Sequence, residues 1–237
     1  MEVYGKNVIK NLLEANHKIE ELIVQDSLVK KYANLIDALS DKGVPVTKIS
    51  KLEMDKLYQG NHQGIVAKAK DYQYANLDDE LDKLSKPFIV MLDGLTDPHN
   101  LGAILRTADC TKCDLVIIPK KRSVLLNATV AKVSTGAIEY VKVCQVSNLN
   151  QAIAKLKKRN IWIYGTDMNA STNYNQVDYA TGVCIVVGNE GKGISQLVKK
   201  NCDYLVKIPM SGHVDSLNAS VSAALMMYEV YNNRFQK

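Results

Sequence analysis

Long apolar runs are missing from this sequence of 237 residues, and none approaches the roughly 18 residues that a membrane-spanning helix needs. The opening stretch, MEVYGKNVIK, lacks the apolar segment of a secretory signal peptide. The five cysteines are an odd number, which does not suit a disulfide scaffold and indicates a reducing compartment. These absences predict a cytoplasmic protein without a membrane partner.

Charge of either sign is also in little excess. Lysine and arginine number 30 and aspartate and glutamate 25, which leaves a net charge of +5. Such a mild basic excess suits a polyanionic partner such as a nucleic acid, but it does not require one. Apolar residues make up 46% of the chain, enough to bury the core of one or two globular domains.

The first part of the chain alternates helical and strand patterns. Apolar residues in YGKNVIKNLLEAN recur on one helical face, and short β-branched runs follow. The expected elements are helices over 4–16 and 27–43 and strands over 20–25, 44–49 and 62–70. We therefore expect a small α/β domain over 1–72, followed by a polar, acid-rich linker over 73–86.

Beyond Pro87, apolar strand patterns alternate with helical ones to the end of the chain. Fully apolar strands that are each followed by a helix are typical of a mostly parallel sheet covered on both faces. The expected strands lie at 88–94, 114–119, 140–146, 161–167, 184–188 and 204–209, with helices near 100–112, 124–133, 148–159, 193–200 and 217–232. The sequence predicts an α/β domain over 87–237.

Polar side chains gather where three of these strands end. In open α/β sheets, ligands bind at the carboxyl ends of the strands. The three stretches are LDGLTDPHNLGAILR (92–106), VVGNEGKGIS (186–195) and KIPMSGHVDSLNASVS (207–222). The first places Asp97, His99, Asn100 and Arg106 around the start of a helix, where a structural turn needs only one or two of them. We take the three strand ends as the candidate site.

The second stretch is rich in glycine, but it does not match the common phosphate-binding motifs. A Walker loop needs Ser or Thr after its lysine, whereas Lys192 is followed by Gly193, and no GxGxxG follows the first strand. Its glycines would expose backbone amides and carbonyls that can hydrogen-bond a planar ligand such as adenine. A tight turn before the next helix explains the stretch equally well, so both interpretations stay open here.

Cys110 and Cys113 form a CxxC motif, but the other cysteines stand singly. Tetrahedral zinc sites need a second pair of ligands, and both cysteines also suit a helix end packed in a reduced core. We expect no metal.

Ser211, His213, Asp215 and Ser216 invite a hydrolase triad, but the GxSxG elbow is absent and triads are assembled from separate strand ends. Ser216 is instead expected to be the N-cap of the last helix. Asn218 is a poor helix former one turn further on, so we expect its amide to bond something across the site.

The three stretches, in this order, resemble the three motifs of the SpoU-type RNA ribose 2'-O-methyltransferases, the TrmH family of the SPOUT superfamily. The matching segments are DPHNLGAILRTA (97–108), VGNEGKGI (187–194) and IPMSGHVDSLNASVSAA (208–224). At the front, YGKNVIKNLL and HQGIVA are similar to the small RNA-binding domain, itself similar to kink-turn-binding ribosomal proteins, of bacterial members that act on large-subunit ribosomal RNA. The resemblance implies a C-terminal SPOUT parallel-sheet domain with a deep trefoil knot.

The resemblance also implies S-adenosylmethionine as the cofactor, without a metal. Its pocket would be lined by backbone at Gly188, Ile208 and Leu217, with Met210 nearby. The implied catalytic residues, contributed from both subunits of a homodimer, are Arg106, Asn100, Glu190, Ser216 and Asn218.

The family's mechanism makes the arginine the base that activates the ribose hydroxyl. A guanidinium with a pKa above about 12 is practically never deprotonated, so we expect another role for Arg106. It would hold the neighbouring phosphate and stabilise the nascent alkoxide, while water or His99 takes the proton. Asn100 would orient the ribose or Arg106, and Glu190 would hold the geometry from the glycine loop.

The sequence therefore predicts an RNA 2'-O-ribose methyltransferase that forms 2'-O-methylguanosine in 23S ribosomal RNA. A transfer-RNA guanosine-2'-O-methyltransferase is the nearest alternative, although the transfer-RNA enzymes of the family carry short helical extensions in place of the N-terminal domain. A catalytically silent RNA-binding assembly protein and a hydrolase that uses Ser211 or Ser216 are alternatives of other classes. The basic clusters at 120–122, 155–159 and 199–200 are candidates to track a phosphate backbone, with solvated faces as the alternative.

Overall fold

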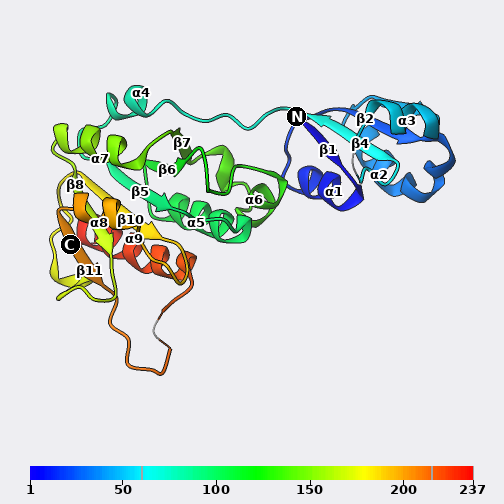
Figure 1. Ribbon diagram of the computed structural model, residues 1–237. Helices are drawn as coiled ribbons and strands as arrows, with labels where there is room; N and C mark the ends of the chain where they lie inside the picture. The colour runs from blue at the N-terminus through cyan, green and yellow to red at the C-terminus, as the bar shows by residue number, and fades with distance from the viewer. Residues whose placement is uncertain (60, 215, 237) are drawn as a thin grey trace. The chain divides into compact units, whose positions relative to one another are not determined.

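The computed structural model describes residues 1–59, 61–214 and 216–236 (Figure 1). The chain divides into two compact units. The first contains Met1–Gln73 and, from later in the sequence, Leu126–Gly136, and the second contains the remaining segments. The division differs from that of the expected domains in two places. From Tyr74 on, the segment expected as a linker belongs to the second unit, and Leu126–Gly136 belongs to the first.

The first unit is built on a four-stranded mixed sheet in the order β1-β4-β2-β3. Its elements are β1 (Glu2–Tyr4), α1 (Lys6–Glu14), β2 (Ile19–Gln25), α2 (Ala33–Ser40), β3 (Val46–Ile49), α3 (Lys51–Leu57) and β4 (Ile65–Ala69). β1 and β2 run antiparallel to β4, and β3 runs parallel to β2. The helix expected over 27–43 is shorter, because 3-10 turns occupy Asp26–Leu28 and Lys30–Tyr32.

Helix α3 was not expected, although the sequence carries its start signal. Ser50 and Glu53 form a capping box, in which each side chain binds the backbone amide of the other residue. This pairing satisfies two of the amides that every helix leaves free at its start.

The core of the first unit includes part of a helix from the middle of the chain, α6 (Ala128–Val133). Ala128 belongs to the same buried cluster as Ile9 and Leu12 of α1. Lys132 of α6 donates to Asn11 Oδ1 (2.9 Å) and lies 3.5 Å from Glu14 Oε2. The first unit thus needs this returning segment to complete its core.

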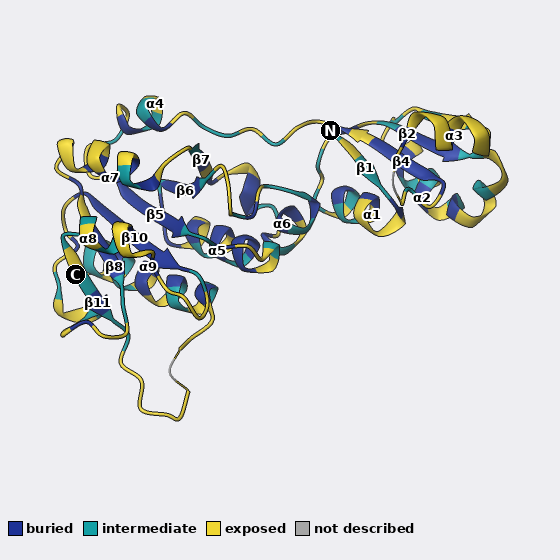
Figure 2. Cartoon of the chain, viewed as in Figure 1, coloured by how far each residue is buried: buried dark blue, intermediate teal, exposed yellow. Residues whose placement is uncertain are grey.

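The second unit contains a seven-stranded sheet in the order β7-β6-β5-β10-β8-β11-β9. The strands are β5 (Phe88–Asp93), β6 (Leu115–Pro119), β7 (Lys142–Val146), β8 (Trp162–Thr166), β9 (Thr172–Asn173), β10 (Val183–Gly188) and β11 (Tyr204–Lys207). Every neighbouring pair is parallel. β5 and β10 are almost wholly buried (Figure 2), as their unbroken apolar sequences predict, so the predicted α/β fold with a parallel sheet is confirmed.

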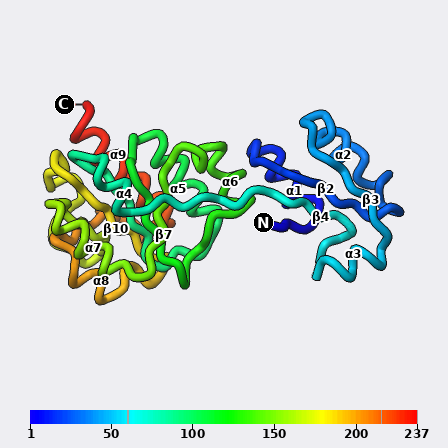
Figure 3. The backbone as a smooth tube through the Cα atoms, turned by 90° about the horizontal axis from the view of Figure 1, so that it is seen from above, coloured from blue at the N-terminus to red at the C-terminus, as the bar shows by residue number. Residues whose placement is uncertain are grey.

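Helices cover both faces of this sheet. They are α4 (Leu77–Leu81), α5 (Pro98–Cys110), α7 (Leu149–Lys158), α8 (Gln196–Asn201) and α9 (Ala219–Phe235). α4, α7 and α8 share a buried cluster with Ile89 and Met91 of β5. Side chains alternate along a strand, and α9 lies on the other face, where its Arg234 stands over the Phe88 ring. α5 packs beside α9 (Figures 1 and 3). The deep trefoil knot that the family resemblance implies for this domain remains a prediction.

The CxxC motif ends in the core of the second unit. Cys113 is buried, and burial raises the pKa of its thiol to about 12, while Cys110 is exposed. Among the described residues, no group of three or more His, Cys, Asp or Glu side chains is placed to hold a metal ion. No helix in the same residues is long and apolar enough to cross a membrane.

Candidate active site

The first motif places Asn100 at the buried start of α5. Asp97 is the N-cap of this helix and accepts a hydrogen bond from the His99 amide (3.0 Å), with Pro98 in the first turn. Asn100 follows one turn later and is only 6% exposed. A buried amide side chain needs partners for its donors and its acceptor.

Those partners come from the other two motifs. Asn100 Nδ2 donates to Glu190 Oε1 (2.8 Å), and Asn218 Nδ2 donates to Asn100 Oδ1 (3.0 Å) and to Glu190 Oε1 (2.6 Å). The Ala219 amide also donates to Glu190 Oε1 (3.2 Å). We call Asn100, Glu190 and Asn218 the amide–carboxylate network. It joins the three predicted catalytic residues that the structure brings together.

Asn218, and not Ser216, is the N-cap of α9, so that expectation was wrong. Its Oδ1 accepts from the amides of Ser220 (2.9 Å) and Val221 (3.3 Å). The expectation that its amide bonds across the site is confirmed, because its Nδ2 reaches the other two motifs. Its low helix propensity is explained by its place just outside the helix. Asp215 lies outside the described residues.

The glycine loop is held in a closed turn by its own backbone. The amide of Asn189 donates to the Gly193 carbonyl (3.1 Å), and the Gly193 amide donates back (2.8 Å). A Cβ atom on Gly188 would lie 2.0 Å from the Gly193 carbonyl carbon. Gly188 therefore has to be glycine for the loop to close, whatever the loop binds.

The loop is also tied to the end of β5. Asn189 Nδ2 donates to the Gly94 carbonyl (2.8 Å), and the Ser195 amide donates to Asp93 Oδ2 (2.8 Å). These bonds bring the second motif against the first. They place Glu190 within reach of α5.

Next to the network lies a cavity of about 290 Å³, formed by the loops that follow β8, β10 and β11. The four predicted cofactor residues, together with Ser216, line it: Gly188, Ile208, Met210 and Leu217. Val187, Ile194 and Val206 add apolar surface, and Glu190 connects the cavity to the amide–carboxylate network. Concave, mostly apolar sites with a few polar groups are typical of ligand pockets.

A charged pair also lines this cavity, and no sequence motif had marked it. Asp167 follows β8, and its carboxylate forms an ion pair with Lys199 of α8. Burial by itself raises the pKa of Asp167. The hydrogen bonds from Lys199 and from the Asn169 amide lower the pKa by more, so it lies below its ordinary value. Asp167 is therefore a carboxylate at neutral pH.

Arg106 stands apart from the amide–carboxylate network of its own chain. Arg106 is six residues after Asn100, so it lies about 9 Å further along the helix axis and is turned by about 240° around that axis. The Arg106 side chain is exposed, and within the described parts of the chain it makes no hydrogen bond or ion pair. His99 is exposed as well. Within one subunit, the amide–carboxylate network thus forms without the positive charge of Arg106.

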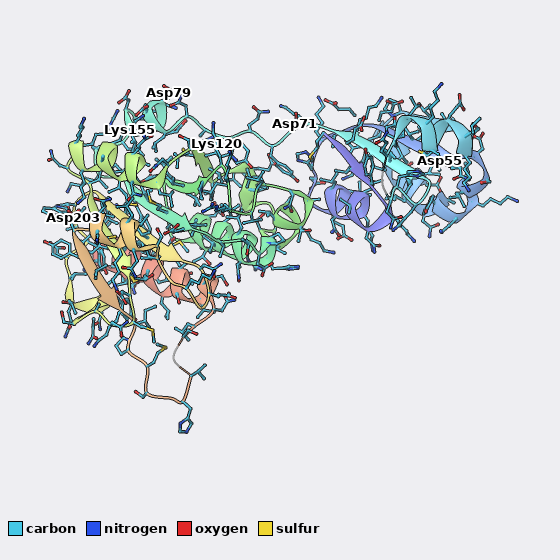
Figure 4. The ribbon with its side chains drawn as sticks, in the orientation of Figure 1. Asp55, Asp71, Asp79, Lys120, Lys155 and Asp203 are labelled. Atoms are coloured by element: carbon cyan, nitrogen blue, oxygen red, sulfur yellow. The ribbon has the colours of Figure 1, made fainter. Side chains whose placement is uncertain are left out.

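The basic cluster at 155–159 is largely neutralised. Lys155 pairs with Asp78 (2.6 Å), Lys157 with Asp203 (2.6 Å) and Arg159 with Asp82 (2.5 Å), and Lys155 and Asp203 are labelled in Figure 4. Two of these acids belong to α4 or its C-terminal end, so the cluster fixes that segment to α7. Because these three side chains already have acidic partners, they are poor candidates for phosphate contacts.

Comparisons with known proteins agree with this geometry. Residues 87–228 match the SpoU rRNA Methylase family, and residues 3–75 match the RNA 2'-O ribose methyltransferase substrate binding domain. A Staphylococcus epidermidis protein whose name assigns it to the TrmH family of tRNA/rRNA methyltransferases is 47% identical over 99% of this chain and 96% of its own. A Bacillus subtilis relative with the same family name, YacO, is 44% identical over 98% and 95%.

The fold has solved counterparts as well. The SpoU methyltransferase AviRb from Streptomyces viridochromogenes, solved in complex with its cofactor AdoMet, superposes with a TM-score of 0.69 at 23% identity. The superposition covers 98% of this chain and 89% of AviRb. With both family models and the close relatives in agreement, the chain belongs to the SpoU family of RNA methylases.

Proposed function

We propose that the protein is an S-adenosylmethionine-dependent RNA 2'-O-ribose methyltransferase that modifies a guanosine of 23S ribosomal RNA. The observation that carries the proposal is the amide–carboxylate network, which joins residues from all three motifs at the wall of a ligand-sized cavity.

The cavity fits the proposed cofactor. Apolar side chains at Ile208, Met210 and Leu217 and the glycine loop offer flat surface and backbone groups for an adenine ring. When bound, S-adenosylmethionine supplies a methyl group on a positively charged sulfur. These residues, with Gly188, would hold it.

The network positions groups and does not supply a base. Glu190 Oε1 already accepts three hydrogen bonds, and both atoms of the Asn100 amide have partners. Glu190 therefore fixes the glycine loop against α5 and α9. Asn100 Nδ2 has a second N–H that the network does not use and that could meet a ribose hydroxyl, while both hydrogens of Asn218 Nδ2 hold Asn100 and Glu190 in place. Ser216 lies at the cavity wall as a further polar contact.

Arg106 would supply the missing positive charge from a second subunit. Val221, Leu225 and Tyr228 of α9 are exposed and spaced by four and three residues, which puts them on one helical stripe. Exposed apolar stripes of this kind are typical of interfaces. We propose that this stripe forms a homodimer, in which Arg106 of the partner subunit completes the site.

The substrate assignment rests on the first unit. A matched substrate-binding domain at 3–75 supports residues 1–72 as the RNA-selecting domain, with a linker over 73–86 and the methyltransferase domain over 87–237. The names of the relatives include both tRNA and rRNA, so transfer RNA is the alternative substrate.

The test is transfer of labelled methyl from S-adenosylmethionine to separately purified, unmodified ribosomal and transfer RNAs, followed by nuclease digestion and identification of the nucleoside. We expect 2'-O-methylguanosine in 23S RNA. Methylation of transfer RNA alone would overturn the substrate assignment and keep the chemistry. Absence of product from both RNAs, with cofactor bound, would favour the silent RNA-binding alternative.

A further inference from the structure

The ion pair of Asp167 and Lys199 has no part in the network that the proposed reaction uses. Both side chains line the cavity, yet they come from the loop after β8 and from α8, outside the three motifs. The Asp167 side chain is 11% exposed and that of Lys199 is 31% exposed. A charged pair kept mostly out of water at a cavity wall calls for a reason.

Asp167 is fixed in position from several sides. Its amide donates to the Val206 carbonyl (2.9 Å), which ties the loop to β11. Its Oδ1 accepts from the Asn169 amide (3.0 Å), and its carboxylate pairs with Lys199. The orientation of the carboxylate is thus set before any ligand binds, which lowers the entropy cost of binding.

The pair still has hydrogen-bonding capacity to offer. Asp167 Oδ2 is buried against Lys199, so Oδ1 is the oxygen that can meet a ligand, and it has a second lone-pair site beside the one that the Asn169 amide uses. The Lys199 ammonium carries three donors, one of which faces Asp167. Together they present an acceptor and a donor side by side at the cavity wall.

The other acid in the cavity is already engaged. Among the described residues that line it, the acidic ones are Asp167 and Glu190. Glu190 Oε1 accepts from Asn100, Asn218 and the Ala219 amide. Asp167 is therefore the acid of the cavity wall that lies outside the amide–carboxylate network.

We infer that Asp167 and Lys199 bind the vicinal diol of the cofactor's ribose. Asp167 Oδ1 accepts a hydrogen bond from one hydroxyl, and Lys199 donates to the oxygen of the other. The inference rests on the proposed cofactor cavity. Carboxylates recognise ribose hydroxyls in the same way in dinucleotide-binding folds.

The diol fits this pair better than the cofactor's ammonium group does. Asp167 and Lys199 together are electrically neutral, so the pair offers little attraction to a second cation, and Lys199 repels it at short range. A neutral diol can use one acceptor and one donor, and the pair supplies both.

Binding calorimetry can test the clamp without the methyl-transfer reaction. The probes are S-adenosylhomocysteine, its 2'-deoxy and 3'-deoxy analogues and its desamino analogue. The wild-type protein should bind S-adenosylhomocysteine at least about 10-fold more tightly than either deoxy analogue, as expected for loss of a charge-assisted hydrogen bond. Asp167→Ala should erase that preference, and Asp167→Asn, which keeps one acceptor, should retain part of it.

A matched control is available in the Lys157–Asp203 pair, where the acid is 20% exposed and lies outside the cavity. Asp203→Ala should lose an ion pair of the same kind and leave the preference for the diol unchanged. Thermal melts of both variants establish that they are folded.

Two results would overturn the clamp. One is an Asp167→Ala protein that keeps the full preference for the diol, and the other is an Asp167→Ala protein that instead stops distinguishing the desamino analogue. The variant Leu217→Trp tests separately whether this cavity is the cofactor site, because the larger side chain fills the cavity from a partly exposed position. If that variant binds S-adenosylhomocysteine normally, the proposed cofactor site is wrong, and the clamp falls with it.

Discussion

The two ends of α9 are both fixed by polar side chains, yet with different kinds of partner. At the first turn, Asn218 binds the side chains of Asn100 and Glu190 at a cavity wall. At the last turn, Arg234 donates to the carbonyls of Tyr179 (2.9 Å), Lys86 (3.0 Å), Pro87 (3.1 Å) and Thr181.

The kind of partner distinguishes a structural role for Arg234 from a functional role for Asn218. Carbonyl partners exist in any sequence, so Arg234 needs only the course of the backbone and serves to anchor the helix. The partners of Asn218 are particular side chains from two other motifs. Between the two ends lies the exposed stripe, and beside α9 lies α5 with Arg106. Substitutions along these two helices should therefore separate catalytic, assembly and stability effects.

The largest effect is expected from Arg106→Ala. Because Arg106 is exposed and outside the cavity, methyl transfer to RNA should fall by about 1,000-fold or more while calorimetric affinity for S-adenosylhomocysteine stays within error. Loss of cofactor affinity would contradict its assignment as the charge that acts on the RNA. Arg106→Lys, which keeps the charge without the planar fork, should recover only part of the rate.

Next in size is the effect of Leu225→Glu combined with Tyr228→Glu on the stripe. The charges should prevent dimer formation in analytical ultracentrifugation and lower activity by about 100-fold, because Arg106 then has no partner site. Leu52→Glu, at an exposed apolar position of α3, adds charge without touching the stripe and should leave both properties unchanged. A monomeric double variant with full activity would rule out a shared site.

Arg234→Ala should affect stability more than chemistry. It leaves several carbonyls without their donor at the end of α9 and should lower the free energy of unfolding by about 3 kcal/mol in urea titrations. Below the unfolding transition the variant should keep near-normal methyl transfer, since the site lies at the other end of the helix. A large loss of rate in the folded variant would refute the separation of the two ends.

The smallest effect on stability is expected at Asn218. Asn218→Ala should lose about 1 kcal/mol of unfolding free energy with the cap. It should also lower methyl transfer by about 10-fold, because Asn100 and Glu190 lose the amide that holds them in place. Asn218→Asp keeps a capping oxygen but places a carboxylate where Nδ2 lies 2.6 Å from Glu190 Oε1.

The Asp variant gives a pH test with a definite sign. Two adjacent carboxylates raise the pKa of one of them above its unfolded value, so the variant should be fully stable at low pH and lose stability as the pH rises through that value. Wild-type protein should show no such loss over the same range. Melting temperatures between pH 4 and pH 8 measure it, and parallel curves would show that Asn218 does not face Glu190 in solution.

Short-range sequence patterns predicted much of the fold. The unbroken apolar runs of β5 and β10 predicted buried parallel strands, and a helix start rich in polar residues was expected where α5 begins. Errors arose where the signal was short or the N-cap was placed two residues too early. The capping box at Ser50 marks a seven-residue helix that was overlooked, and the N-cap of α9 was assigned to Ser216 in place of Asn218.

The sequence predicted those site residues that belong to the three motifs. Asn100, Glu190 and Asn218 meet as expected of one site, and all four proposed cofactor residues line one cavity. Asp167 was missed because it looks like an ordinary surface charge in the sequence, and Lys199 was assigned only to a basic cluster that was a candidate to track a phosphate backbone, although it pairs with Asp167. The cluster at 155–159 was misjudged for the same reason, since its acidic partners lie far away in sequence.

By itself, the sequence determined the elements, their burial and the three strand ends that carry polar residues, because periodicity, capping and glycine placement act over a few residues. Only the tertiary structure decided which distant groups meet. Asn100 and Asn218 lie 118 residues apart, the segment 126–136 returns to the first unit, and Asp167 pairs with Lys199 at a cavity wall. Strand order and helix packing, which involve the whole chain at once, create these contacts.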